Sequence, residues 1–139
     1  YAGLGHSTDE MKVICSVHNL NWLDEQEDVR PFIQRADAVV LPSYREGLSR
    51  ALMEACAMET PIIASNAPGC EELVNNNENG LICNVRDSKD LAKKMLQFAD
   101  LPWNERQTMG KNARKMVVDH YSDKIIFESY LNAIADKLN

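Results

Sequence analysis

Short apolar runs punctuate the chain and indicate where its strands lie. The run 38–41 is continuous, apolar and partly β-branched, and it ends at Pro42, which is typical of a strand buried on both faces. The runs 61–64 and 81–83 share this character, and 17–21 is a further candidate for a short strand. The pattern therefore predicts four short strands.

Apolar positions between and after these runs recur at helical spacing. In 48–58, apolar residues fall at i, i+3, i+4, i+7 and i+8, namely Leu48, Ala51, Leu52, Ala55 and Cys56. Ser7 (in a capping box with Glu10), Asp28 and Ser88 are the expected N-cap residues. Helices are predicted after the capping box, from 28 onward, and over 48–58, 69–74, 89–99, 102–120 and 123–138.

The alternation of strands and helices predicts the fold class. Parallel strands need a crossover connection, which a helix supplies, and the crossovers are right-handed. We therefore expect an α/β domain with an open, doubly wound parallel sheet, helices on both faces and a helical C-terminus. At 139 residues one domain is the default, and its core needs no disulfide or metal.

Charge and hydropathy exclude two classes of partner. The chain has 15 Lys and Arg against 21 Asp and Glu, a net charge of −6, which argues against a nucleic-acid partner. No apolar run reaches the roughly 18 residues of a membrane span, so no transmembrane segment is expected. An anionic ligand would have to be held by backbone amides and a few local cations.

The cysteines and histidines indicate neither disulfides nor a metal. They are scattered along the chain without a C-x-x-C pair or ligand spacing: Cys15, Cys56, Cys70, Cys83, His6, His18 and His120. We expect the thiols to be small buried apolar groups in a reducing compartment, and we expect no bound metal.

The segment 42–49 leads from a predicted strand into a helix, the place where open α/β sheets bind ligands. Gly47 permits a close backbone approach, and the amides of Leu48, Ser49 and Arg50 are expected to be free at the helix start. Such a helix start binds anions, phosphates above all. We interpret Arg50 and the neighbouring Arg45 as solvated charges rather than phosphate ligands.

Two carboxylates lie on either side of this predicted helix start. Glu46 precedes the helix and Glu54 follows eight positions later, a rise of about 12 Å if all eight were helical. That spacing suits a ligand with hydroxyls at both ends and phosphates between them. Taken alone, the spacing leaves open that Glu46 only decorates the turn and that Glu54 faces solvent.

Residues 41–55 read LPSYREGLSRALMEA and resemble the E-x7-E signature of the retaining group 1 (family 4) glycosyltransferases of GT-B fold. The chain is similar to their C-terminal, donor-binding domain over essentially its whole length, most closely over 38–83. Further motifs follow the family's order and spacing: VHNLNW (17–22), DVRPF (28–32), TPIIA (60–64), PGCEELV (68–74) and NGLI (79–82).

The resemblance implies a role for each matching position. Glu54 resembles the residue that binds the ribose hydroxyls of the donor nucleotide, and Glu46 the catalytic-site residue that binds hydroxyls of the transferred sugar. Gly47, Leu48 and Ser49 would present backbone amides to the sugar and the diphosphate.

The reaction implied is hexosyl transfer, with retention, from an NDP-sugar (UDP-, GDP- or ADP-linked) to an acceptor hydroxyl, in surface polysaccharide or glycan biosynthesis. The resemblance implies no metal or other cofactor. It implies a cytoplasmic enzyme. Whether the acceptor domain contacts the inner face of the membrane stays open. Two alternatives also stay open: a GT-B-fold sugar-nucleotide epimerase, and a non-catalytic interaction module of the same fold.

The sequence departs from the family pattern in three respects. Ser49 stands where the family often has Pro, a tolerable change at a helix start. Nothing before Tyr1 supplies the Arg and Lys that the family's preceding strand and loop bring to the diphosphate. The N-terminal acceptor domain is absent as well, so we interpret residues 1–139 as a donor-binding domain truncated at its start. Gly69 and Glu72 are expected to fix the geometry of the next strand-end loop.

We predict that these 139 residues alone transfer no sugar, because the acceptor domain and part of the diphosphate site are missing. A radiometric assay with UDP-, GDP- and ADP-sugars and a mixed-glycan acceptor should show no product above background. Turnover that disappears in Glu46→Gln would contradict this prediction.

Overall fold

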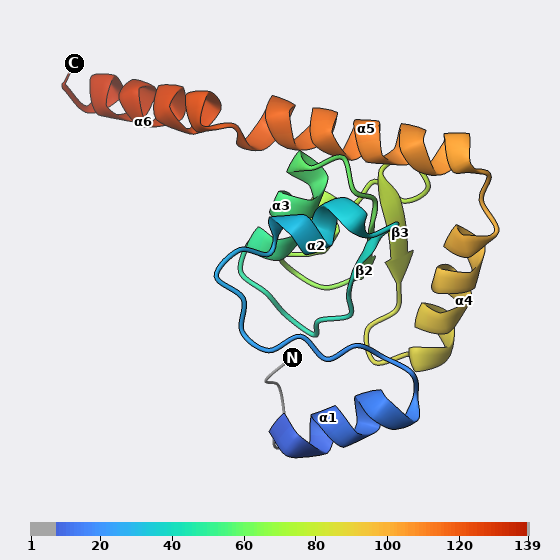
Figure 1. The fold of residues 1–139 in the computed structure, drawn as a ribbon. Helices are drawn as coiled ribbons and strands as arrows, with labels where there is room; N and C mark the ends of the chain where they lie inside the picture. Colours follow the sequence, from blue (N-terminus) through green and yellow to red (C-terminus); the bar gives the residue numbers. More distant parts are fainter. Residues whose placement is uncertain (1–7, 139) are drawn as a thin grey trace.

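A three-stranded parallel sheet forms the centre of the molecule. The computed structural model describes residues 8–138, and in this part of the chain the strands are β1 (Val39–Leu41), β2 (Ile62–Ser65) and β3 (Gly80–Cys83), adjacent in that order (Figure 1). The register pairs Val40 with Ile63 and Ile63 with Leu81. Three of the four predicted strands are thus confirmed, each with its boundary within one residue.

Helices make up most of the remaining described chain. They are α1 (Thr8–Val17), α2 (Arg30–Arg35), α3 (Arg50–Ala57), the 3₁₀ turn η1 (Glu71–Leu73), α4 (Ser88–Ala99), α5 (Trp103–Tyr121) and α6 (Asp123–Leu138). The predicted helices are therefore present, although 69–74 contracts to the short 3₁₀ turn η1.

The sheet is covered on both faces, as the doubly wound architecture requires. Successive side chains of a strand point to opposite faces. On β2, Ile62 and Ala64 belong to one apolar core with Leu52 of α3, whereas Ile63 belongs to a second core with Phe98 of α4. In Figure 1, α3 and α4 accordingly lie on opposite sides of the sheet, and α5 runs along one end of it.

The predicted strand 17–21 is wrong. Val17 still belongs to α1, and the chain then closes the helix with a turn in which Asn19 is left-handed, at φ 55°. The amide of His18 donates to the carbonyl of Ile14 (3.1 Å) and that of Leu20 to Cys15 (2.8 Å). These amides satisfy carbonyls of the last helical turn, so they are not available to a strand ladder.

The capping side chains differ from those expected. Asp87, not Ser88, caps α4, and its Oδ1 accepts from the amides of Lys89 and Asp90. A carboxylate accepts both bonds, which a hydroxyl does less readily. Asp28 lies one position too early to be the N-cap of α2, although its Oδ1 accepts from the amide of Arg30 (3.0 Å). The expected cap Ser7 lies outside the described residues.

All four cysteines are buried, which confirms the expectation that the thiols are small buried groups. Burial raises the pKa of the Cys56 thiol to about 12. Burial, followed by the negative charges of Glu46 and Glu72, raises the pKa of the Cys70 thiol to about 11. Both thiols therefore stay protonated near neutral pH, and neither serves as a nucleophile.

The C-terminal helices differ in how they are packed. α5 buries Met109, Ala113 and Val117, whereas α6 extends beyond the sheet (Figure 1) and, over 123–135, exposes most of its apolar side chains. Those with the largest exposure are Phe127, Tyr130, Leu131 and Ile134. Within residues 8–138 no helix is long and apolar enough to cross a membrane.

Gly110 of α5 lies directly against the backbone of the turn that follows α3. A Cβ placed on Gly110 would lie 2.0 Å from the carbonyl oxygen of Glu59, the residue that leaves α3 with a left-handed backbone at φ 60°. Backbone rather than a movable side chain fills this space, so only glycine fits without a shift of the helix.

We predict that Gly110→Ala lowers the free energy of unfolding by about 2 kcal/mol, since overpacking outweighs the better helix propensity of alanine. Equilibrium urea unfolding measures this. Gln107→Ala, at an exposed position of the same helix, is the control and should change stability by less than about 0.5 kcal/mol. Equal stability of the two variants would show that α5 does not depend on this contact.

Candidate functional site

The loops that follow the three strands meet at the carboxyl edge of the sheet. They comprise residues 42–49 after β1, 66–70 after β2 and 84–87 after β3. The first two are joined by backbone hydrogen bonds from Glu46 to Pro68 (3.0 Å) and from Ser49 to Gly69 (3.1 Å). The carboxyl edge of an open α/β sheet is where ligands bind, so these loops form the candidate site.

Gly69 allows the first two loops to touch. Its φ is +84°, and a Cβ there would lie 1.8 Å from the carbonyl oxygen of Gly47 and 2.6 Å from that of Glu46. The amide of Gly69 donates to Oε2 of Glu72 at 2.7 Å, which confirms the expectation that these two residues fix the loop. Any other residue at position 69 would push the loops apart.

Glu46 is held in place by two buried serines. Oγ of Ser43 donates to Oε1 of Glu46 at 2.5 Å, and Oγ of Ser65 in turn donates to the carbonyl oxygen of Ser43. Ser43 and Ser65 are 4% and 2% exposed, whereas Glu46 is half-buried at the mouth of the site. The carboxylate is therefore oriented while part of it remains accessible to a ligand.

The helix start is less open than the sequence indicated. α3 begins at Arg50, two residues later than predicted, with Ser49 as its N-cap and Oγ of Ser49 accepting from the amide of Leu52. The expectation of a free amide at Ser49 is wrong, because that amide donates to Gly69. Among the described residues none accepts a hydrogen bond from the amides of Gly47 or Leu48, and both residues are exposed.

Glu54 lies one turn inside α3, half-exposed, with Oε1 3.8 Å from Nη2 of Arg50. An exposed pair at this distance is weak, so Glu54 can exchange Arg50 for the hydroxyls of a ligand. The chain from Glu46 to Arg50 is not helical, so the rise of about 12 Å for a fully helical segment does not apply. Both carboxylates nevertheless flank the start of one helix.

This arrangement has a defined chemistry. Two carboxylates accept hydrogen bonds from hydroxyls, and amides at a helix start donate to anions. Within residues 8–138 no group of three or more His, Cys, Asp or Glu side chains is placed to hold a metal ion. The edge therefore suits a ligand that combines hydroxyls with phosphate.

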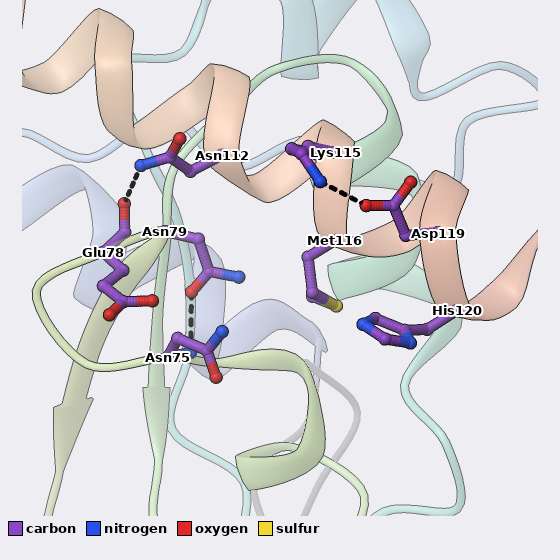
Figure 2. Close-up of a pocket in the computed structure, with 8 residues that line it drawn as sticks. All are labelled: Asn75, Glu78, Asn79, Asn112, Lys115, Met116, Asp119 and His120. Atoms are coloured by element: carbon purple, nitrogen blue, oxygen red, sulfur yellow. Dashed lines mark hydrogen bonds and ion pairs between the residues drawn. The ribbon is translucent and has the colours of Figure 1, made fainter.

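A cavity of about 290 Å³ lies away from this edge, between the turn before β3 and the second half of α5 (Figure 2). Its lining includes none of the predicted site residues: Asn75, Glu78, Asn79, Asn112, Lys115, Met116, Asp119 and His120. Several of these groups already bond to one another, such as Nζ of Lys115 to Asp119 and Nδ2 of Asn112 to the carbonyl of Glu78. We assign no function to this cavity.

The sequence of the chain is similar to those of known glycosyltransferases. The family model for glycosyl transferases group 1 matches residues 3–116. The capsular polysaccharide biosynthesis glycosyltransferase CapM of Staphylococcus aureus is 32% identical over 125 residues, which are 88% of this chain and 33% of the relative. An N,N'-diacetylbacillosaminyl-diphospho-undecaprenol α-1,3-N-acetylgalactosaminyltransferase of Campylobacter jejuni is 31% identical over 128 residues, 88% of this chain and 34% of the relative. The chain thus spans about a third of the length of these relatives.

Solved structures share the fold. Sucrose-phosphate synthase from Thermosynechococcus elongatus superposes with a TM-score of 0.78 at 25% identity, over 92% of this chain and 34% of its own. A glycosyltransferase from Rickettsia africae reaches a TM-score of 0.85 at 22% identity, over 95% of this chain and 36% of its own. The superpositions confirm a domain of the GT-B type.

We predict that Gly69→Ala lowers the free energy of unfolding by about 2 kcal/mol or more, because its Cβ would overlap the backbone of Gly47. Equilibrium urea unfolding again measures this. Gly47→Ala is the matched control: nothing lies within 4 Å of its added Cβ, so stability should change by less than about 0.5 kcal/mol. If both variants unfold at the same urea concentration as the wild type, the loops do not depend on Gly69.

Proposed function

Because this chain belongs to the group 1 glycosyl transferases, we propose that it is the donor-binding part of an enzyme that transfers a hexosyl group. The donor in this proposal is an NDP-sugar, the acceptor is a hydroxyl, and the anomeric configuration is retained. The product is a surface polysaccharide or a related glycan.

The observation that carries the proposal is the placement of Glu46 and Glu54 on either side of the α3 start. Oγ of Ser43 orients Glu46 by a hydrogen bond of 2.5 Å to Oε1, and within the described part of the chain the partner of the Glu54 carboxylate is Arg50, in a weak, exposed pair. In the proposed complex Glu46 accepts from hydroxyls of the transferred sugar, and Glu54 accepts from the ribose hydroxyls. The amides of Gly47 and Leu48 then donate to the sugar and the diphosphate.

The charge requirement of the reaction is consistent with this assignment. As the glycosidic bond breaks, the leaving diphosphate gains negative charge and the sugar becomes cationic. Preorganised amides at a helix start stabilise the negative charge of the leaving diphosphate without having to reorganise. Glu46 acts here as a residue that positions the donor, unlike the paired carboxylates of glycoside hydrolases. Ser49 takes part through the cap that it provides for α3, since its own amide is occupied.

The relatives support transfer over the alternatives. CapM is named for capsular polysaccharide biosynthesis, and the Campylobacter jejuni relative for transfer of N-acetylgalactosamine to a diphospho-undecaprenol-linked sugar. Neither name supports the epimerase or the non-catalytic module. In our proposal the donor is cytoplasmic and no metal takes part. A second domain binds the acceptor.

We predict that the chain binds UDP-, GDP- or ADP-sugars through Glu54. A ligand-observed NMR screen with the three donor classes should give saturation transfer to one of them. Because Glu54→Ala removes the acceptor for the ribose hydroxyls, it should weaken that binding by about tenfold or more, the expected effect of losing hydrogen bonds to a charged group.

The control for this screen is Glu78→Ala, which removes a carboxylate beside the cavity of Figure 2. This variant should bind the donor as the wild type does. Equal binding by wild type and Glu54→Ala would reject the ribose assignment, and the absence of binding to all three donors would reject the proposed donor class.

A further inference from the structure

Arg86 lies in the loop after β3 and reaches across the carboxyl edge to the loop after β1. Its Cζ lies 5.0 Å from the ring centroid of Tyr44, which is 51% exposed and precedes Glu46 by two positions. A cation over an aromatic face is held by the ring quadrupole. The sequence alone gives no reason to connect two residues so far apart in the chain.

The stacked guanidinium keeps its charge available. Within residues 8–138 no carboxylate forms an ion pair with Arg86. The nearest acids along the chain have other partners: Asp87 caps α4, and Oδ2 of Asp90 accepts from the amide of Asn84 at 2.8 Å. Stacking uses the face of the guanidinium and leaves its edge, with the N–H donors, free.

The backbone at Arg86 is unusual as well. Its φ is 61°, in the left-handed region that favours glycine. Among other residues, Asn, Asp and His are enriched in this region, whereas arginine is uncommon there. Glycine or asparagine would meet this backbone requirement at a lower cost, so the turn itself does not call for an arginine.

We propose that Arg86, supported by Tyr44, is a phosphate-binding residue of this edge and takes a phosphate of a diphosphate-bearing substrate. A planar guanidinium binds two phosphate oxygens at once. The positive charge would offset the negative charges of Glu46 and Glu54, which otherwise oppose an anionic substrate at the same edge. The inference rests on the proposed function, because it takes the substrate class from there.

The phosphate has two possible sources. One is the sugar nucleotide; the other is a lipid-linked diphosphate acceptor, of the chemistry that the name of the Campylobacter jejuni relative describes. Isothermal titration of the chain with UDP, uridine and farnesyl diphosphate separates them. Uridine tests nucleoside binding without phosphate, and farnesyl diphosphate tests a prenyl diphosphate without a nucleoside.

The informative variant is Arg86→Gly, because glycine suits φ 61° and should leave the fold as stable as before or more so. We expect it to weaken UDP binding by about fivefold or more and to leave uridine binding unchanged. Tyr44→Ala should have the same effect, and Tyr44→Phe, which keeps the ring, should bind as the wild type does. Weakened binding of farnesyl diphosphate alone would assign the phosphate to the acceptor.

Two controls match the change. Asn77→Gly makes the same backbone substitution at φ 66°, in the turn before β3, and Lys93→Gln removes one charge from an exposed position on α4. Neither should alter the affinity for the two diphosphates. If Arg86→Gly behaves like these controls with both ligands, or if the wild type binds neither, the inference is wrong.

Glu54→Ala in the same titration separates this inference from the proposed function. If Glu54→Ala weakens UDP binding and Arg86→Gly changes the binding of neither UDP nor farnesyl diphosphate, the phosphate site is rejected and the ribose assignment stands. If Arg86→Gly weakens UDP binding and Glu54→Ala does not, the ribose assignment is rejected and the phosphate site stands.

Discussion

The close contact between the backbones of Gly69 and Gly47 is the constraint on which the carboxyl edge depends. Parallel pairing of β1 with β2 brings the two following loops side by side, and two backbone hydrogen bonds then join them. Gly69 can lie against the peptide of Gly47 only because it has no side chain. The contact fixes the backbone of Glu46 and of Ser49, the N-cap of α3, through the bonds to Pro68 and Gly69, while Ser43 orients the Glu46 carboxylate.

Much of the fold was predictable, because its strands are apolar on both faces and its helices carry a periodic apolar side. The runs 38–41, 61–64 and 81–83 became strands since neighbouring strands and helices cover them. The run 17–21 differs from them, because His18, Asn19 and Asn21 interrupt it, and it continues a helix and its closing turn. Two apolar residues among five do not make a strand when no neighbouring strand of the described chain pairs with them.

The site was predictable only as far as its residues are close in sequence. Glu46 and Glu54 stand in one motif, so their common location at the start of α3 could be expected. The hydroxyl of Ser65, which supports Ser43, lies on another strand, and the occupied amide of Ser49 depends on the loop after β2. Contacts of this kind require the register of the sheet, which no local pattern contains.

The buried thiols have a consequence for how the molecule can be observed. Cys15, Cys56, Cys70 and Cys83 are distributed over α1, α3, the loop after β2 and β3, and each is enclosed in the native state. An alkylating reagent can reach a given thiol only when the surrounding element opens. The relative rates at which the four thiols are alkylated would therefore rank the elements by the free energy of their local opening, without an introduced probe.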